Sequence, residues 1–278
     1  MDYCITEADI SAFRLALRSA ERSAGTVAQY GRAVSGLRRW LDGRGVSQEL
    51  LNDWKGELAS RYSARTVNAM LAAVNCFCKF AGTPFRLRFL KVQRAAFRDA
   101  ARELTRTDYE RLLRTAEGSG QRRLALIMET LCATGIRISE LRYITVEAAQ
   151  AGRATISLKG KIRTILLSTK LCRKLLKYAR KQKIASGEVF LTKSGKPITR
   201  RQVWYELKRL CKAAGVEASK VFPHNFRHLF ATIFYRACKD IARLADVLGH
   251  SSIETTRIYL TVSGTEQARQ LDRLGLVS

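Results

Sequence analysis

The spacing of apolar residues predicts helices along most of residues 6–80. In the stretch TVAQYGRAVSGLRRWL, residues 26–41, apolar side chains recur every three or four positions, which places them on one side of a helix. The stretch SARTVNAMLAAVNCFCKFAG, residues 63–82, repeats this pattern and ends on Gly82, where a helix C-terminus is expected. The first part of the chain is therefore expected to be helical throughout.

A break in the pattern follows at Pro84, within the basic stretch TPFRLRFLKVQRAAFRD. This composition is typical of a linker, here about residues 82–100, that lies across an anionic partner. We place the domain boundary at residue 98. It divides the chain into a helical domain, residues 1–98, and a second domain, residues 99–278.

The second domain is expected to be mixed. A helix capped by Thr105 or Thr107 opens it, and two apolar helices follow that are interrupted at ATGIR, residues 133–137. In RATISLKGKIRTILLS, residues 153–168, two short β-rich runs are joined by a tight KGK, which predicts a hairpin. Helices resume at about residue 169. The predicted fold class is mainly α with one small β-hairpin, in two domains.

The chain is strongly basic. The 278 residues hold 50 Lys and Arg against 24 Asp and Glu, a net charge of +26. Residues 101–278 carry +19 of this, and between Glu147 and Glu188 there are eleven basic residues and no acidic one. Such a field attracts polyanions, so nucleic acid or an anionic membrane surface is the expected partner.

Of the two partners, the membrane is the weaker hypothesis. No apolar run approaches the length of a spanning helix, and the opening MDYCITEADI lacks the basic and apolar regions of a signal peptide. The seven cysteines are an odd number and form no C-x-x-C pair, as in proteins with reduced thiols. We therefore expect a cytoplasmic protein that binds no membrane.

Two of the three histidines, His224 and His228, lie four residues apart in VFPHNFRHLF. On a helix this spacing suits zinc, as in H-E-x-x-H, or it places His224 beside Arg227 for a phosphate. Zinc is disfavoured because Asn225 stands where the glutamate base belongs and because a cationic Arg227 opposes the charge of the metal. We expect neither a metal nor any other cofactor.

The third histidine, His250, precedes an expected helix start in LGHSSIETTRIYL. Ser251 and Glu254 there have capping-box spacing, and the backbone N–H groups at such a start favour an anion. Tyr259 follows nine residues after His250. Taken alone, Tyr259 is better interpreted as a half-buried core residue than as a catalytic one.

Arg137 lies in ATGIRISEL, and Lys159 lies at the expected hairpin tip. Either residue alone could be an ordinary surface or turn residue. In chain order, however, ATGIRISEL, the strand-borne lysine, HNFRH, LGHSS and a tyrosine nine residues later closely resemble the tyrosine recombinases, the phage-integrase and Xer family. The resemblance covers essentially the whole chain and is strongest over residues 222–259.

This resemblance implies that Tyr259 is the nucleophile, forming a 3′-phosphotyrosyl link to DNA and releasing a 5′-hydroxyl. Arg137 and Arg227 would clamp the phosphate, because a planar and permanently charged fork suits the charge of the transition state. The bond energy is kept in the phosphotyrosine. Neither ATP nor metal is then required.

The resemblance also implies that His224 is the general base toward Tyr259, that His250 hydrogen-bonds the phosphate, and that Lys159 protonates the departing oxygen. The hairpin sequence LKGKIR is one residue shorter than the common family form G-K-G-x-K-x-R. Lys161 therefore stays open as the alternative acid. We interpret His228 as a packing residue.

DNA contacts are expected at four basic residues, Lys161 and Arg163 on the hairpin and Arg200 and Arg201 at a helix start. The resemblance implies double-stranded DNA with an inverted-repeat core site. It further implies a tetramer on two duplexes, held together by the C-terminal segment GTEQARQLDRLGLV. Packing of that segment on its own domain is the alternative.

The expected function is thus site-specific recombination, either integration and excision of a mobile element or resolution of chromosome dimers. Two alternatives stay open. A type IB topoisomerase would relax DNA with similar chemistry, and a non-catalytic DNA-binding protein would form no covalent adduct.

Overall fold

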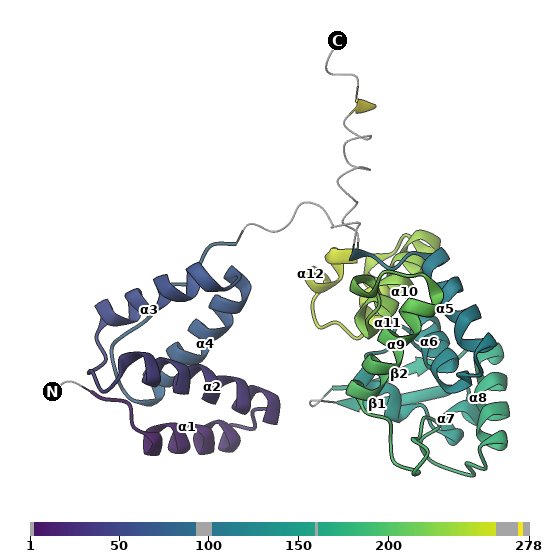
Figure 1. Ribbon diagram of the computed structural model, residues 1–278, viewed down its shortest axis with the longest axis horizontal. Helices are drawn as coiled ribbons and strands as arrows, with labels where there is room; N and C mark the ends of the chain where they lie inside the picture. Colours follow the sequence, from purple (N-terminus) through teal and green to yellow (C-terminus); the bar gives the residue numbers. More distant parts are fainter. Residues whose placement is uncertain (1–2, 93–101, 159–160, 260–271, 275–278) are drawn as a thin grey trace. The chain divides into compact units, whose positions relative to one another are not determined.

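The computed structural model describes residues 3–92, 102–158, 161–259 and 272–274, and the chain forms two compact units, residues 1–94 and 95–278 (Figure 1). Each unit has its own buried apolar core. The predicted boundary at residue 98 lies outside the described residues. None of the helices in the described ranges is long and apolar enough to cross a lipid bilayer.

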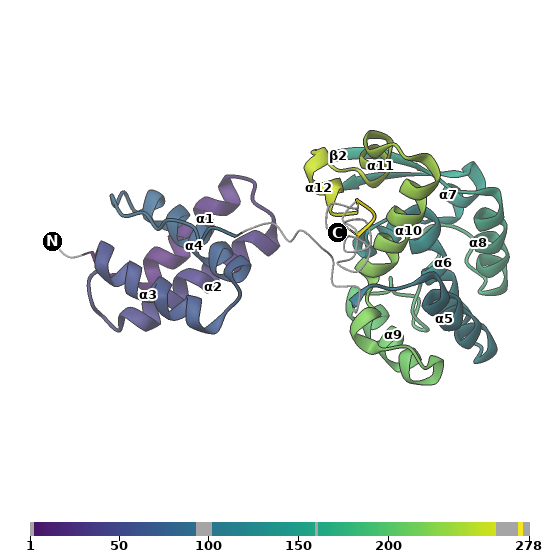
Figure 2. The same cartoon turned by 90° about the horizontal axis from the view of Figure 1, so that it is seen from above.

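The first unit is helical, as its apolar spacing predicts (Figure 2). A serine or threonine side chain caps the N-terminus of each helix, and the core includes Phe13, Leu37 and Phe77, which are at most 1% exposed. Phe13 and Phe77 pack edge to face with their ring centroids 5.3 Å apart. Its elements are α1 (Glu7–Ser19), α2 (Ala24–Leu41), α3 (Gln48–Arg61) and α4 (Ala64–Phe80).

The segment after α4 corrects the prediction of a linker from residue 82 onward. Leu87 is 1% exposed, and its backbone exchanges two hydrogen bonds with the side-chain amide of Asn75, at 2.8 and 2.9 Å. Asn68 binds the backbone of Leu90 in the same way. This stretch is therefore part of the first unit, because asparagines on α4 satisfy the hydrogen bonds of its extended backbone.

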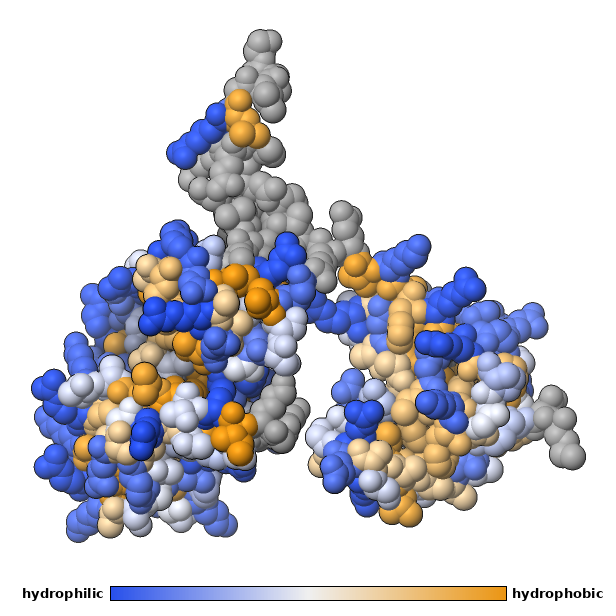
Figure 3. Space-filling view, turned by 180° about the vertical axis from the view of Figure 1, so that it is seen from behind, coloured by the Kyte–Doolittle hydropathy of each residue, from blue (hydrophilic) through white to orange (hydrophobic). Residues whose placement is uncertain are grey.

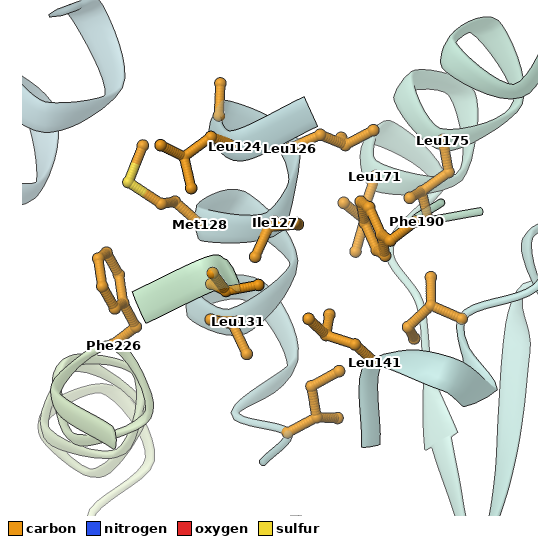
Figure 4. Close-up of a cluster of buried hydrophobic side chains, with 14 of the residues drawn as sticks. Leu124, Leu126, Ile127, Met128, Leu131, Leu141, Leu171, Leu175, Phe190 and Phe226 are labelled. Carbon is orange, nitrogen blue, oxygen red and sulfur yellow. The ribbon is translucent and has the colours of Figure 1, made fainter. Parts of the chain in front are cut away.

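The second unit is built around α6, whose residues Ile127 and Leu131 are fully buried (Figure 4). Helices α5, α8 and α10 pack on it. The helices of the unit are α5 (Arg106–Gly118), α6 (Arg122–Thr134), α7 (Val146–Ala151), α8 (Thr169–Lys181), α9 (Arg200–Ala214), α10 (Pro223–Cys238), α11 (Ile241–Leu248) and α12 (Ile253–Thr256). Short 3-10 helices in the described part include η2 (Ile138–Tyr143), η3 (Ala218–Lys220) and η4 (Arg257–Tyr259).

The predicted hairpin is present as β1 (Arg153–Leu158) and β2 (Lys161–Leu166), an antiparallel pair. Its tip, residues 159–160, lies outside the described residues. Thr105 caps α5 in a reciprocal box with Asp108, which selects it over Thr107. The fold class is confirmed: the protein is mainly helical with one two-stranded antiparallel sheet.

The interruption at ATGIR forms as predicted, but the helix after it is η2 rather than an α-helix. Helix α6 ends at Thr134, and Gly135 adopts the left-handed conformation with φ +63°. On the face shown in Figure 3, hydrophilic side chains cover most of the larger unit, with hydrophobic patches between them.

Gly135 gives a stability prediction. A Cβ at this position would lie 2.3 Å from the Phe230 ring, whereas Gly152, with φ +68°, has nothing within 4 Å. Alanine at either site incurs left-handed strain of roughly 1–2 kcal/mol. We expect Gly135→Ala to lose about 1–3 kcal/mol more because it also overpacks its surroundings. Urea denaturation of the two variants checks this, and equal losses would contradict it.

Candidate active site

Arg227 is the buried centre of the candidate site. Pro223 starts α10 at its first turn, and the fifth residue of that helix, Arg227, is 1% exposed. Its guanidinium donates to the carbonyl oxygens of Gly135, at 2.6 Å, and Leu248, at 2.7 Å. These carbonyls belong to the C-terminal ends of α6 and α11, where backbone acceptors lack helical partners and the helix dipole is negative. The two helix ends therefore stabilise a charge that would otherwise be costly to bury.

The environment of Arg227 lowers its pKa to about 10. Burial is the main cause, and the positive charge of Arg137 adds to it. A hydrogen bond and the charge of Tyr259 act in the opposite direction. The guanidinium is still protonated at neutral pH. It brings together residues from α6, α10, α11 and η4.

His250 is held in one tautomer by this arrangement. Its Nε2 lies 2.9 Å from Arg227 Nη2, and its Nδ1 lies 2.9 Å from the hydroxyl of Thr256. Because arginine can only donate, Nε2 accepts and Nδ1 carries the proton. Burial, followed by the charges of Arg227 and Arg137, lowers the pKa of His250 to about 4. His250 is therefore neutral at pH 7.

Tyr259 lies among imidazole rings and is 4% exposed. Its ring centroid is 4.6 Å from that of His228, at a steep angle, and 6.0 Å from that of His250, nearly parallel. His228 in turn lies 4.6 Å from His224. The order in space is therefore His224, His228, Tyr259. The structure places His228, expected only to pack, next to the tyrosine.

His224 stands in the first turn of α10 and is exposed. The surrounding protein still desolvates its ring, which lowers its pKa, and the charges of Arg227, Arg137 and Arg200 lower it further. A neutral imidazole at pH 7 can accept a proton.

Arg137 belongs to a second charged group. Its Nη1 donates to Glu140 Oε1 at 3.0 Å, and its backbone N–H donates to Oε2 at 2.7 Å. The Glu140 side chain is 2% exposed, whereas that of Arg137 is 43% exposed. Glu140 thus orients Arg137, while much of the Arg137 side chain is open to solvent.

Arg163, expected to bind DNA, is also engaged with Glu140. Its Nη2 donates to Glu140 Oε2 at 2.7 Å, its Nη1 donates to the Val247 carbonyl at 2.8 Å, and its side chain is 15% exposed. Little of this guanidinium is accessible to a DNA phosphate. The expectation of DNA binding stays a prediction.

Two of the other predicted DNA-binding residues, Arg200 and Arg201, lie on the surface. Arg200 and Arg201 are exposed in the first turn of α9, and the Arg201 guanidinium lies 5.8 Å from the Tyr205 ring centroid. Lys159 lies outside the described residues. Lys161 is the first residue of β2, and its side chain is outside the described part.

The expected cap at Ser251 is wrong by one position. Ser252 is the N-cap of α12, and its hydroxyl accepts from the Glu254 N–H at 3.2 Å. The α-helix there is only four residues long, so it offers a much weaker anion site than expected. Sequence reasoning also missed Thr256 as the partner of His250, because only the fold brings its hydroxyl to Nδ1.

Comparison with known proteins identifies a matching family. The model of the phage integrase family matches residues 102–266. The chain is 30% identical over 226 residues to tyrosine recombinase XerA of Thermococcus kodakarensis, covering 77% of this chain and 78% of that protein. It is 28% identical over 266 residues to tyrosine recombinase XerD of Xanthomonas axonopodis pv. citri, covering 86% and 87%.

Solved structures share the fold. A crystal structure of XerA recombinase matches 99% of this chain and 100% of its own, with a TM-score of 0.54 and 22% identity. A lambda integrase dimer bound to a COC' core site matches 93% and 78%, with a TM-score of 0.72 and 17% identity. The family model covers more than half of the chain, and the chain is therefore a member of the phage integrase family, the tyrosine recombinases.

Proposed function

We propose that the protein is a site-specific DNA recombinase that cuts and rejoins DNA through a 3′-phosphotyrosyl bond to Tyr259. One observation carries the proposal. The buried guanidinium of Arg227 joins Tyr259 and His250 to the helix end that precedes Arg137. A nucleophile and cations suited to phosphate thus meet at one place.

The phosphate would bind to Arg137 and Arg227. The described part of the site holds three guanidinium groups, on Arg137, Arg163 and Arg227, and one carboxylate, on Glu140. The charge of Arg137 lowers the pKa of both Arg163 and Arg227, so an incoming anion relieves this repulsion. Arg137 is the accessible cation, and Arg227 is the rigid one.

His224 would take the proton of the Tyr259 phenol, and the lowered pKa of its imidazole keeps it in the accepting form at pH 7. The His228 ring lies between those of His224 and Tyr259. Direct proton transfer from Tyr259 to His224 would therefore require a small displacement of these side chains. Otherwise His228 would relay the proton. Tyr259 is 4% exposed, so attack also requires α12 and η4 to open toward the DNA.

His250 would donate to a phosphate oxygen only in its other tautomer. The Thr256 hydroxyl would then donate to Nδ1, leaving the proton on Nε2, and Arg227 Nη2 would turn from His250 to the phosphate. Phosphate binding would thus replace the bond between Arg227 and His250.

The lysine of the hairpin would protonate the departing 5′-oxygen, with Lys159 preferred over Lys161. The DNA contacts of Lys161, Arg200 and Arg201 would supply affinity that falls with salt. We further propose an inverted-repeat core site, a tetramer joined through the C-terminal segment, and a cytoplasmic location. A lambda integrase tetramer bound to a Holliday junction is among the structures of similar fold. The division at residue 98 into a DNA-clamping and a catalytic domain belongs to the same proposal.

Replacing Tyr259 tests the nucleophile. Tyr259→Phe keeps the ring contacts but removes the attacking oxygen, so covalent adducts should vanish while DNA binding persists. The matched control is Tyr235→Phe, since Tyr235 packs on the same small cluster. Nicked fragments of the source genome are incubated with each protein, denatured, and sequenced if they stay attached.

Adducts at one inverted-repeat site are expected with the native protein and with Tyr235→Phe. Adducts spread over all sequences would instead indicate a topoisomerase. Adducts that persist in Tyr259→Phe would overturn the assignment of the nucleophile.

The arginine clamp should contribute more than the general acid. We expect Arg137→Ala to slow cleavage by about 10³–10⁵-fold and Lys159→Ala by about 10²–10⁴-fold. The control is Arg142→Ala, because Arg142 is exposed and lies on η2, the 3-10 helix whose N-cap is Arg137. Single-turnover cleavage rates at saturating DNA check the order, and a larger loss in Lys159→Ala would contradict it.

The histidines predict a pH dependence. Since the pKa of His250 is lowered to about 4, the unfolded chain binds more protons than the folded one between that value and about 6.5. The free energy of unfolding should therefore fall as the pH falls through this range. Only three imidazoles exist in the chain, so NMR titration with single His variants assigns each of them. A His250 that titrates near pH 6.5 would contradict the geometry.

A further inference from the structure

Arg163 differs from Arg153, an exposed arginine on the other strand of the hairpin. Its side chain is 15% exposed, and each of its two terminal nitrogens has a partner from a different part of the chain. Nη2 binds Glu140, 23 residues earlier, and Nη1 binds the carbonyl of Val247, 84 residues later. Arg163 therefore bridges η2 and the end of α11 from the strand β2.

The bridge touches the residue beside His250. Gly249 ends α11 with φ +65°, and a Cβ there would lie 2.5 Å from Cδ of Arg163 and 2.6 Å from its Nη1. The arginine thus occupies the space that any other residue at position 249 would need. The turn that delivers His250 is packed directly against the Arg163 side chain.

The same guanidinium also acts on Arg137. Glu140 is 2% exposed and binds both arginines, with Arg137 Nη1 on Oε1 and Arg163 Nη2 on Oε2. Its carboxylate is thereby fixed from two sides, which limits the positions open to Arg137. A buried carboxylate with only one cationic partner would be held less firmly.

We propose that Arg163 is a positioning residue that fixes Arg137, the His250 turn and the hairpin to one another. This inference rests on the proposed function and assigns Arg163 a different role from the DNA contact expected from sequence. The strand β2 begins at Lys161, two residues before Arg163, so the hairpin carrying the candidate general acid is tied to the phosphate-binding side. Substitution of Arg163 should then slow DNA cleavage without weakening DNA binding.

The first experiment compares Arg163→Met with Arg153→Met, which removes one charge from an exposed position on the other strand of the hairpin. The probe is the nicked source-genome duplex that the native protein captures. We expect Arg163→Met to lose about 10²-fold in single-turnover cleavage at saturating DNA, the effect of a displacement near 1 Å in a catalytic group. Its Kd and salt dependence should equal those of Arg153→Met.

A phosphate contact by Arg163 gives a different result. The salt slope would then be lower by about 0.9 than in Arg153→Met, and cleavage at saturating DNA would be native. That outcome would overturn the inference.

Two further variants separate positioning from general stability. Arg163→Lys keeps the charge, but one ammonium cannot span Glu140 and the Val247 carbonyl, so we expect a rate between those of the native protein and Arg163→Met. In a Glu140→Gln background, Arg163→Met should cost less than the roughly 10²-fold expected in the native background, since its action through Glu140 is already lost and only its contact with the His250 turn remains. The bridge would be contradicted if the rate losses of Arg163→Met and Glu140→Gln multiplied fully in the double variant. A native cleavage rate in Arg163→Lys would also contradict it. Urea denaturation verifies that each variant is folded.

A DNA-free measurement distinguishes this inference from the proposed function. Arg163 is among the charges that lower the pKa of His250, so Arg163→Met should raise the pKa of that imidazole in an NMR titration, and Arg153→Met should not. An unchanged pKa would count against the bridge. Absence of any adduct from the native protein would count against the proposed function alone.

Discussion

The burial of one guanidinium, that of Arg227, organises the second unit. It is tolerated because the carbonyl oxygens of Gly135 and Leu248, at two helix ends, accept hydrogen bonds from the guanidinium. His250 accepts a third hydrogen bond. Gly135 has to be glycine for α6 to end in this way beside Phe230. The end of α6, the end of α11 and the segment carrying Tyr259 are thus placed by a single side chain.

The electrostatics of the site follow from this burial. Burial, followed by the charges of neighbouring arginines, lowers the pKa of His224, His250 and Arg227, so both imidazoles are neutral at pH 7. Glu140, between Arg137 and Arg163, offsets only part of the repulsion. In the proposed reaction, these charges would favour the DNA phosphate before it binds, which is the preorganisation that phosphoryl transfer requires.

Much of this could be predicted from local sequence. The helical spacing, the Thr105 cap and the KGK hairpin depend on neighbouring residues. The resemblance of the motifs, in chain order, to the tyrosine recombinases brought Arg137, Arg227 and Tyr259 into one hypothesis. The bridge of Arg163 could not be predicted, because its partners lie 23 and 84 residues away. The same holds for His228, whose contact with Tyr259 depends on where α12 folds back. The Ser251 cap failed by one position because two adjacent serines are chemically equivalent candidates.

We propose that the residues gathered around Arg227 make Tyr259 a nucleophile toward DNA. The most direct measurement is mass spectrometry of peptides that remain attached to nucleotides after nuclease and protease digestion of a denatured reaction. We expect a 3′-nucleotide phosphate on the peptide containing Tyr259. A nucleotide on any other residue, or cleaved DNA with no linked peptide, would contradict it.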